Sequence, residues 1–306
     1  MRSKWTFLFI ALFLLSFPIQ GRATVYMISY EPNWGAPAAG DAHWAALYTV
    51  NISNGAATKV GNIECQGNQI VLTDIAFSPD TRKLYAINGD DSGTQLYTLD
   101  YLNPVSGVVK ATLLCSFDVI DLQGLAMSPE GEYLYAGSGT TGTAGETPGD
   151  LYLIYPLEAK ISLVGSLGSL SSTQPIGMGY GNSYVFGGDL ELDSNKIMYG
   201  SVSTATADHS ADIFSFSTLD PGTGKATLIG NAFDNGAITG LAFVPGSYSP
   251  GIMYACDYSG AFYQLNTEDG SLVFLGSNAV CQVGMTYAPP VTDAQVPAHV
   301  FMMLLD

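Results

Sequence analysis

The chain has 306 residues, of which 10 are Lys or Arg and 27 are Asp or Glu, so its formal net charge is −17. Such a surface repels phosphate backbones and anionic lipids, which argues against nucleic acids and acidic membranes as partners. Charged residues make up only 12% of the chain, whereas Gly occurs 35 times and Tyr 18 times. This composition is typical of an all-β protein with many tight turns.

Residues 1–23 have the pattern of a secretory signal peptide. "MRSK" supplies basic residues, "WTFLFIALFLLSF" is apolar, and the small residues Gly21 and Ala23 precede a cleavage site. An uncleaved anchor is the alternative, but the apolar run is shorter than the roughly 20 residues that a spanning helix needs. We therefore expect cleavage after Ala23 and a secreted or periplasmic mature chain. Loss of three basic residues and no acidic one makes its net charge −20.

A unit of several short strands recurs along the rest of the chain. Leu72 to Asp100, "LTDIAFSPDTRKLYAINGDDSGTQLYTLD", contains three apolar runs separated by a Ser-Pro-Asp turn and an acidic loop. "LQGLAMSPEGEYLYAGSG" from Leu122 and "ITGLAFVPGSYSPGIMYACDY" from Ile238 repeat its first half, and "GDLELDSNKIMYGSV" from Gly188 does so more loosely. The second half is repeated too, with the leading aromatic residues Tyr48, Tyr97, Tyr152, Phe214 and Tyr263.

A repeat of about 50 residues that contains four short strands indicates a blade of a β-propeller, because each such sheet buries its faces only against its neighbours. The sequence therefore predicts an all-β fold, a β-propeller of four-stranded blades. Five blades are expected. Six are the alternative, because Ile161 to Phe186 is longer than its counterparts and has room for a degenerate blade.

The two ends of the repeat region are out of phase. Thr24 to Tyr30 resembles a second strand that has no first strand before it, whereas Gly284 to Pro289 matches the first-strand segment Gly124 to Pro129. The C-terminal strand is therefore predicted to join the N-terminal blade and close the ring, which removes exposed sheet edges. The propeller domain is predicted over 24–290, followed by a flexible C-terminal extension over 291–306.

The blade motifs "DIAFSPDTRKLYAI" and "LDPGTGKATLIG" resemble those of secreted bacterial propellers of the lactonase, gluconolactonase-like and NHL type. They also resemble exported propeller families with "LYxLDPxTGxATLIG" units. The resemblance covers nearly all of the mature chain and implies the propeller fold. Gluconolactonase-like enzymes hold a calcium ion at the mouth of the central channel, so the resemblance also implies a calcium-dependent lactonase or hydrolase as one functional alternative.

The long connections are predicted to leave the propeller at one face, where ligands of such folds usually bind. Solvated acidic surface is the alternative interpretation of these loops. The candidate ligand-binding residues on them are Trp34, His43, Trp44, Asp90, Asp91, Asp208 and His209.

Carboxylates also occur where the repeats otherwise carry glycine. Asp74 and Asp189 align at the starts of two inner strands, and Glu191 lies on the same side of its strand as Asp189. Oxygen ligands of this kind suit Ca²⁺, so these three residues are the candidate metal ligands. The alternative is that each Asp accepts hydrogen bonds from a backbone turn.

The predicted topology brings Cys256 close to Cys281, which predicts one disulfide in an oxidising compartment. The His residues lack zinc-ligand spacing, and no phosphate loop, nucleophile elbow or haem motif occurs. Three functions stay open. The first is a monomeric binding module for a carbohydrate, peptide or protein partner; the second is the calcium-dependent hydrolase; the third is a structural cell-envelope protein.

Overall fold

The computed structural model describes residues 24–31, 44–90, 93–119, 122–138, 149–167, 184–204, 213–230, 238–246, 251–257, 259–277 and 282–290. Their regular structure consists of strands alone, which confirms the predicted all-β class. In this part of the chain no helix has the length and hydropathy required to cross a membrane. Val25–Tyr287 forms one compact unit, and the description that follows concerns this unit.

Three four-stranded antiparallel sheets follow one another in the second half of the unit, each in simple chain order. The first contains β9 (Leu122–Met127), β10 (Leu134–Ser138), β11 (Asp150–Tyr155) and β12 (Lys160–Ser166). The second contains β13 (Tyr184–Leu192), β14 (Met198–Thr204), β15 (Ile213–Leu219) and β16 (Ala226–Gly230). The third contains β17 (Ile238–Val244), β18 (Ile252–Asp257), β19 (Ala261–Leu265) and β20 (Leu272–Ser277).

The remaining strands form one nine-stranded sheet of order β21-β1-β2-β3-β8-β7-β6-β5, with β4 paired to β3. It consists of two four-stranded arrays whose outermost strands, β3 and β8, pair in parallel from Asn62↔Val108 to Cys65↔Ala111. The strands are β1 (Thr24–Glu31), β2 (Trp44–Val50), β3 (Ala57–Cys65), β4 (Asn68–Gln69), β5 (Asp74–Ser78), β6 (Lys83–Asp90), β7 (Gly93–Leu99), β8 (Val108–Phe117) and β21 (Gln282–Ala288).

Two features of this sheet bear on the predicted blades. The strand at Gln282–Ala288 lies beside β1, so a segment from the C-terminal region completes the first array, as its sequence match to Gly124–Pro129 indicates. The pairing of β3 with β8 differs from the expectation of separate four-stranded sheets. The reason is length: β3 has 9 residues and β8 has 10, so both extend past their own sheets and meet at the periphery.

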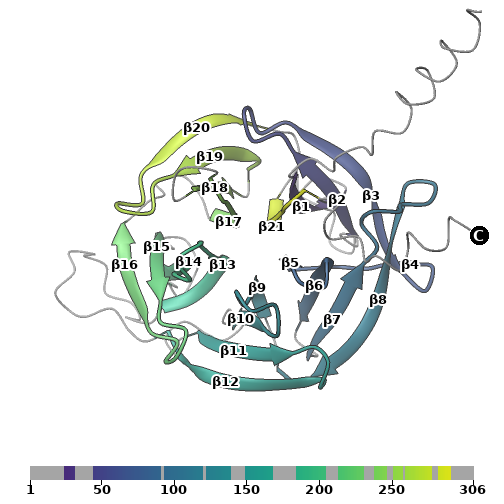
Figure 1. The fold of residues 1–306 in the computed structure, drawn as a ribbon, viewed down its shortest axis with the longest axis horizontal. Helices are drawn as coiled ribbons and strands as arrows, with labels where there is room; N and C mark the ends of the chain where they lie inside the picture. Colours follow the sequence, from purple (N-terminus) through teal and green to yellow (C-terminus); the bar gives the residue numbers. More distant parts are fainter. Residues whose placement is uncertain are drawn as a thin grey trace, which may run out of the picture. The chain divides into compact units, whose positions relative to one another are not determined.

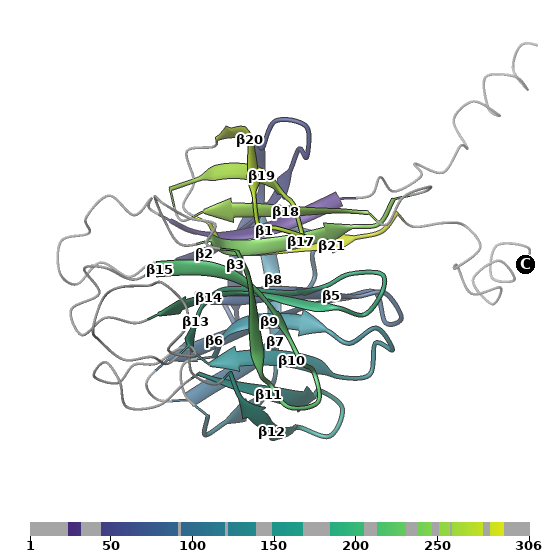
Figure 2. The same cartoon turned by 90° about the vertical axis from the view of Figure 1, so that its left-hand side faces the viewer.

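The sheets are arranged around a common centre, as in a β-propeller (Figure 1). In this view β5, β9, β13, β17 and β21 lie innermost, and β3, β8, β12, β16 and β20 lie outermost. Figure 2 shows that many strands run along a common axis, some in one direction and some in the other, so their connections leave at two opposite ends. The first-to-second and third-to-fourth connections leave at one end, which we call the turn end. The second-to-third and sheet-to-sheet connections leave at the other, which we call the loop end.

Apolar residues are buried between successive sheets and not within a single central core. One cluster joins Ala76 and Tyr85 of the second array to Leu125 and Leu134 of the next sheet. Corresponding clusters fill the next two interfaces. A fourth cluster joins the last sheet to the first array through Tyr254, Phe262, Met27 and Tyr48, among others. Each sheet thus buries both faces against neighbours, which explains why inner runs such as Ile75–Phe77 are apolar throughout.

The recurring glycine of the "ATLIG" motif has a packing role at the periphery. It follows a register shift in the outer strand, and its backbone packs against a hairpin turn of the following sheet. A Cβ built on Gly230 would lie 2.2 Å from the carbonyl oxygen of Asp269, and one on Gly276 would lie 2.1 Å from that of Asn54. Gly61 and Gly165 pack in the same way, and Cys115 occupies the equivalent place in β8.

Truncation tests the role of β21. Removing residues 281–306 deletes the strand that pairs with β1, and we expect loss of cooperative unfolding in urea. Removing 291–306 alone leaves β21 in place, so its urea midpoint should match that of the full mature chain. A cooperatively folded chain that ends at residue 280 would contradict the role assigned to β21.

Glycine substitution tests the peripheral packing. Gly230→Ala and Gly276→Ala force a methyl group against a backbone carbonyl, so each should lower the free energy of unfolding by about 1–3 kcal/mol in urea denaturation. Gly222→Ala is the matched control, because its Cβ would meet only the Asp220 carboxylate, at 3.4 Å. Equal effects at all three positions would show that the destabilisation comes from the lost backbone freedom of glycine and not from the packing between sheets.

Candidate functional site

Two of the predicted ligand-binding residues, Trp44 and Asp90, lie in the part of the chain that the structure describes. Trp44 begins β2, is half-buried and lies opposite Glu31 in the register. Asp90 ends β6, where it pairs with Gly93 of β7 in the register. The other candidates lie outside the described residues: Trp34, His43, Asp91, Asp208 and His209. Their grouping at one end stays a prediction.

The candidate metal ligands Asp74 and Asp189 lie on two of the inner strands and have no exposed surface. The Oδ1 of Asp74 accepts a hydrogen bond from the Ile75 amide at 2.7 Å, and its Oδ2 accepts one from the Leu125 amide at 2.6 Å. The Oδ2 of Asp189 accepts from the amides of Leu241 at 2.6 Å and Met285 at 3.1 Å. Both carboxyl groups therefore reach across to the inner strands of other sheets.

Glycine at two of the aligned positions makes room for a neighbouring side chain. A Cβ built on Gly284 of β21 would lie 2.0 Å from the Oδ1 of Asp74. One built on Gly240 of β17 would lie 2.5 Å from the Sγ of Cys256. Glycine at these places is thus a steric requirement: Gly284 leaves space for the Asp74 carboxyl group and Gly240 leaves space for the Cys256 thiol.

Burial and proximity favour protonation of this group. Burial, together with the neighbouring Asp189, raises the pKa of Asp74 well above its ordinary value. Burial raises the pKa of Asp189 to about 7, although its hydrogen bonds oppose the rise. Burial, with Asp189 nearby, also raises the pKa of Glu191 well above its ordinary value. Asp74 and Asp189 lie close enough to influence each other's pKa values, and the Oδ1 of Asp189 is buried without a hydrogen-bond partner.

These hydrogen bonds bear on the predicted calcium site. Three of the four oxygens of Asp74 and Asp189 accept backbone amide hydrogen bonds, and Glu191 accepts from the amide of Leu192 at 2.9 Å. Among the described residues no three His, Cys, Asp or Glu side chains are arranged to hold a metal ion. The geometry matches the alternative in which each Asp bonds to the backbone, and calcium binding by Asp74, Asp189 and Glu191 stays a prediction.

Cys256 is a buried free thiol on β18. It lies directly opposite Gly240 in the register, so its sulfur packs against the inner strand beside Met285 and Asp189. Burial raises the pKa of this thiol well above its ordinary value. Because Cys281 lies outside the described residues, the Cys256–Cys281 disulfide stays a prediction.

The leading tyrosines of the repeats form hydrogen bonds that the sequence did not reveal. The hydroxyl of Tyr263 donates to the Oδ2 of Asp257 at 3.0 Å, and that of Tyr152 donates to Asp150 at 3.4 Å. Asp257 also accepts from Ala261 at 2.9 Å, which fixes the turn before β19. Burial, with Asp257 nearby, raises the pKa of Tyr263 to about 12. The two-residue spacing of Asp150 and Tyr152 was the available signal, but similar spacings are common in strands.

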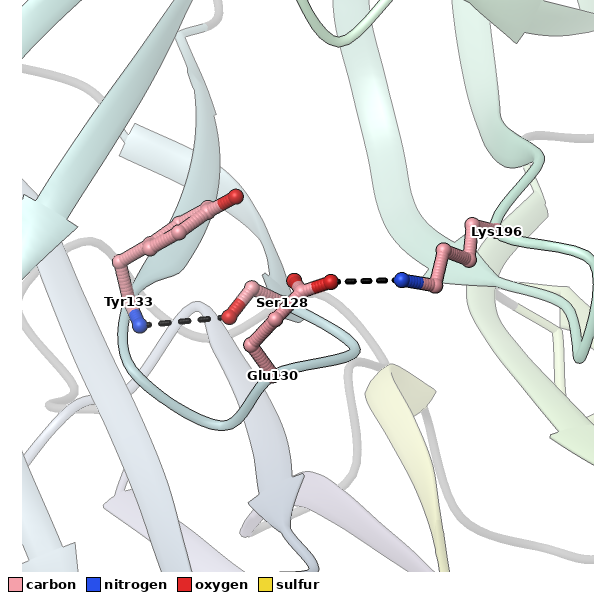
Figure 3. A network of polar contacts seen from close by, with 4 residues as sticks. All are labelled: Ser128, Glu130, Tyr133 and Lys196. Atoms are coloured by element: carbon pink, nitrogen blue, oxygen red, sulfur yellow. Dashed lines mark hydrogen bonds and ion pairs between the residues drawn. The ribbon is translucent and has the colours of Figure 1, made fainter.

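The turn end is built from short, well-defined turns. Figure 3 shows the amide of Tyr133 donating to the Oγ of Ser128, at 3.3 Å, which closes the turn between β9 and β10. Lys196, from the turn between β13 and β14, forms an ion pair of 2.6 Å with Glu130. The two side chains are 63% and 45% exposed. An exposed pair of this kind stabilises a fold by less than about 1 kcal/mol.

Comparison with known proteins leaves the activity open. No family model and no curated protein matches the chain. Among solved structures, TolB from Acinetobacter baumannii has a TM-score of 0.49 at 13% identity, over 92% of this chain and 70% of that one. A nidogen/laminin complex gives 0.48 at 10% identity, over 87% and 98%. The periplasmic gluconolactonase PpgL of Pseudomonas aeruginosa gives 0.44 at 10% identity, over 87% and 99%. Likenesses this distant carry no inference about function.

The raised pKa values predict a stability that falls as pH rises. The pKa of Asp189 is about 7 in the folded chain against an ordinary value of 3.8, so between these values the folded chain binds more protons than the unfolded chain. Linkage then requires the free energy of unfolding to decrease across this range. Urea denaturation of wild type between pH 4 and pH 8 should show a decrease that exceeds that of Asp189→Asn by on the order of 1 kcal/mol or more. Parallel pH profiles would contradict the shift.

Proposed function

We propose that this protein is an exported, five-bladed β-propeller that binds a carbohydrate, peptide or protein partner at its loop end. The observation that carries the proposal is the commitment of the inner carboxyl groups to the backbone. Asp74 and Asp189 accept amide hydrogen bonds from three other inner strands and are fully buried, so they serve the scaffold. The side chains that are free to bind a partner are then those of the connections at the loop end.

The five-bladed ring is supported by the sheet arrangement. The two arrays of the nine-stranded sheet and the three separate sheets each contain four antiparallel strands in order, from inside to outside. An apolar cluster also joins the last sheet to the first array, and β21 pairs with β1. Both observations are expected of a ring that is closed by strands from the two ends of the chain.

The difference between the two ends supports the position of the binding surface. At the turn end, turns such as Ser128–Tyr133 are short and closed by their own hydrogen bonds. The connections that are predicted to lie at the loop end carry Trp34, His43, Asp208 and His209, and Trp44 begins the strand β2 beside them. Indole rings stack on sugar faces, and carboxylates and imidazoles bond to hydroxyl or amine groups. Such side chains suit a polar ligand, and long loops on a rigid scaffold commonly supply binding residues.

Export is supported by the sequence of residues 1–23, with its basic start, apolar run and small residues before the cleavage position. The mature charge of −20 also favours partners that are neutral or basic. Charge alone gives binding that salt abolishes, whereas stacking on an aromatic ring persists in salt. This difference separates a specific partner from a general attraction to cations.

Tryptophan fluorescence offers a direct test, because the mature chain retains only Trp34 and Trp44. The proposal places both at the loop end, so their emission should report on that end. We expect one class of probe, among defined xylo-oligosaccharides, malto-oligosaccharides and tryptophan-free peptides, to shift the emission saturably in 150 mM NaCl. Asp208→Asn with His209→Ala should weaken that binding at least tenfold, while the urea midpoint stays unchanged.

Lys196→Ala is the matched control, because this exposed residue lies at the turn end and its ion pair contributes little to stability. It should leave probe binding unchanged. Equal weakening by the turn-end and loop-end variants would contradict the proposed surface, as would the lack of a response to every probe. Hydrolysis of an added sugar lactone by the purified protein would instead favour the lactonase alternative.

A further inference from the structure

We infer that Asp74 and Asp189 share one proton, with Asp74 as the donor and the Oδ1 of Asp189 as the acceptor, and that this bond links the two sets of inner strands that the carboxyl groups contact. The inference concerns a conformational device of the scaffold and does not depend on what the loop end binds. Its evidence is the distribution of hydrogen bonds on the two carboxyl groups.

The two residues divide the inner strands between them. Asp74 belongs to β5 and accepts from Leu125 of β9. Asp189 belongs to β13 and accepts from Leu241 of β17 and Met285 of β21. By themselves these carboxylate hydrogen bonds form two sets of strands, and the bond from the Phe77 amide of β5 to the Thr286 Oγ1 of β21, at 3.1 Å, links the sets once. The inferred bond between Asp74 and Asp189 links them a second time.

The proximity of the carboxyl groups also follows from their positions on β21. The Oδ1 of Asp74 lies against the backbone of Gly284, and the Oδ2 of Asp189 accepts from the next residue, Met285. Two ionised carboxylates this close and without solvent would repel strongly. The other titratable groups beside the pair are Glu191 of β13 and Cys256 of β18, and Asp257 lies near Cys256. These are acids too, so among the described residues a proton is the available source of attraction.

The placement of the proton follows from the one unused oxygen. Both oxygens of Asp74 accept amide hydrogen bonds, as does the Oδ2 of Asp189. Of these four oxygens, only the Oδ1 of Asp189 is buried without a hydrogen-bond partner. A buried acceptor with no donor is costly, so this oxygen is the one to which a proton on Asp74 points.

This arrangement predicts opposite effects of two similar substitutions. In Asp189→Asn, the amide oxygen keeps the bonds from Leu241 and Met285, and the NH₂ group takes the place of the unused oxygen and donates to Asp74. In Asp74→Asn, the NH₂ group must replace an oxygen that accepts from Ile75 or Leu125. One buried amide then loses its acceptor.

The experiment is urea denaturation of the mature chain at pH 7, in EDTA and in Ca²⁺ at matched ionic strength. We expect a midpoint for Asp189→Asn at or above that of wild type. The unfolding equilibrium constant of Asp74→Asn should rise at least about fivefold, which is the usual cost of an unpaired buried amide. Asp257→Asn serves as the control, because both oxygens of this buried Asp accept hydrogen bonds and its replacement should destabilise the fold.

Infrared spectroscopy gives a second measurement if Asp74→Asn does not fold. In a Glu191→Gln background, which removes the other shifted carboxyl group, the band of a protonated carboxyl should be present at pH 7 and absent from the Asp189→Asn variant. Three results would overturn the inference: absence of that band from the parent chain, destabilisation by Asp189→Asn as large as that by Asp74→Asn, or a rise in midpoint that only Ca²⁺ produces.

Discussion

The inner edges of the sheets impose the constraint on which this fold depends. An inner strand pairs on one side only, so some of its amide groups face the centre of the molecule without a sheet partner, and a buried amide requires an acceptor. Asp74 and Asp189 supply acceptors to Leu125, Leu241 and Met285. Where several sheet edges converge, two side chains thus supply the hydrogen-bond acceptors that no neighbouring strand provides.

At the periphery the sheets are joined by a different means, the close packing of backbone against backbone. There the sheets diverge, and the turns of one sheet pack against the outer strand of the preceding one. Gly230 and Gly276 allow a carbonyl oxygen to approach their backbone, which a larger residue would prevent. The sheets are therefore joined by hydrogen bonds at the centre, by apolar clusters at mid-radius and by backbone packing at the rim.

This distribution separates the scaffold from the surface that is free to vary. The inner Asp and Gly residues, the rim glycines and the apolar clusters are all fixed by packing, so their repetition in the sequence reflects the architecture. The binding residues proposed for the loop end belong to none of these groups of packed residues. A binding surface placed there can change its residues without affecting the interactions that hold the sheets together.

The repeats alone were sufficient to predict the all-β class, the four-stranded unit and the extra strand at Gln282–Ala288, because strand alternation and turn residues are local properties that each copy displays. The alignment of Asp74 and Asp189 with glycines was visible as well, but its meaning was not. Whether the two carboxyl groups bind an ion or each other depends on which amide groups surround them, and these come from residues up to 96 positions away in the chain. The parallel pairing of β3 with β8 and the free thiol of Cys256 were also decided only by tertiary structure, since both depend on how neighbouring sheets are placed. Local sequence thus determined the strands, and the convergence of distant strands determined the chemistry between them.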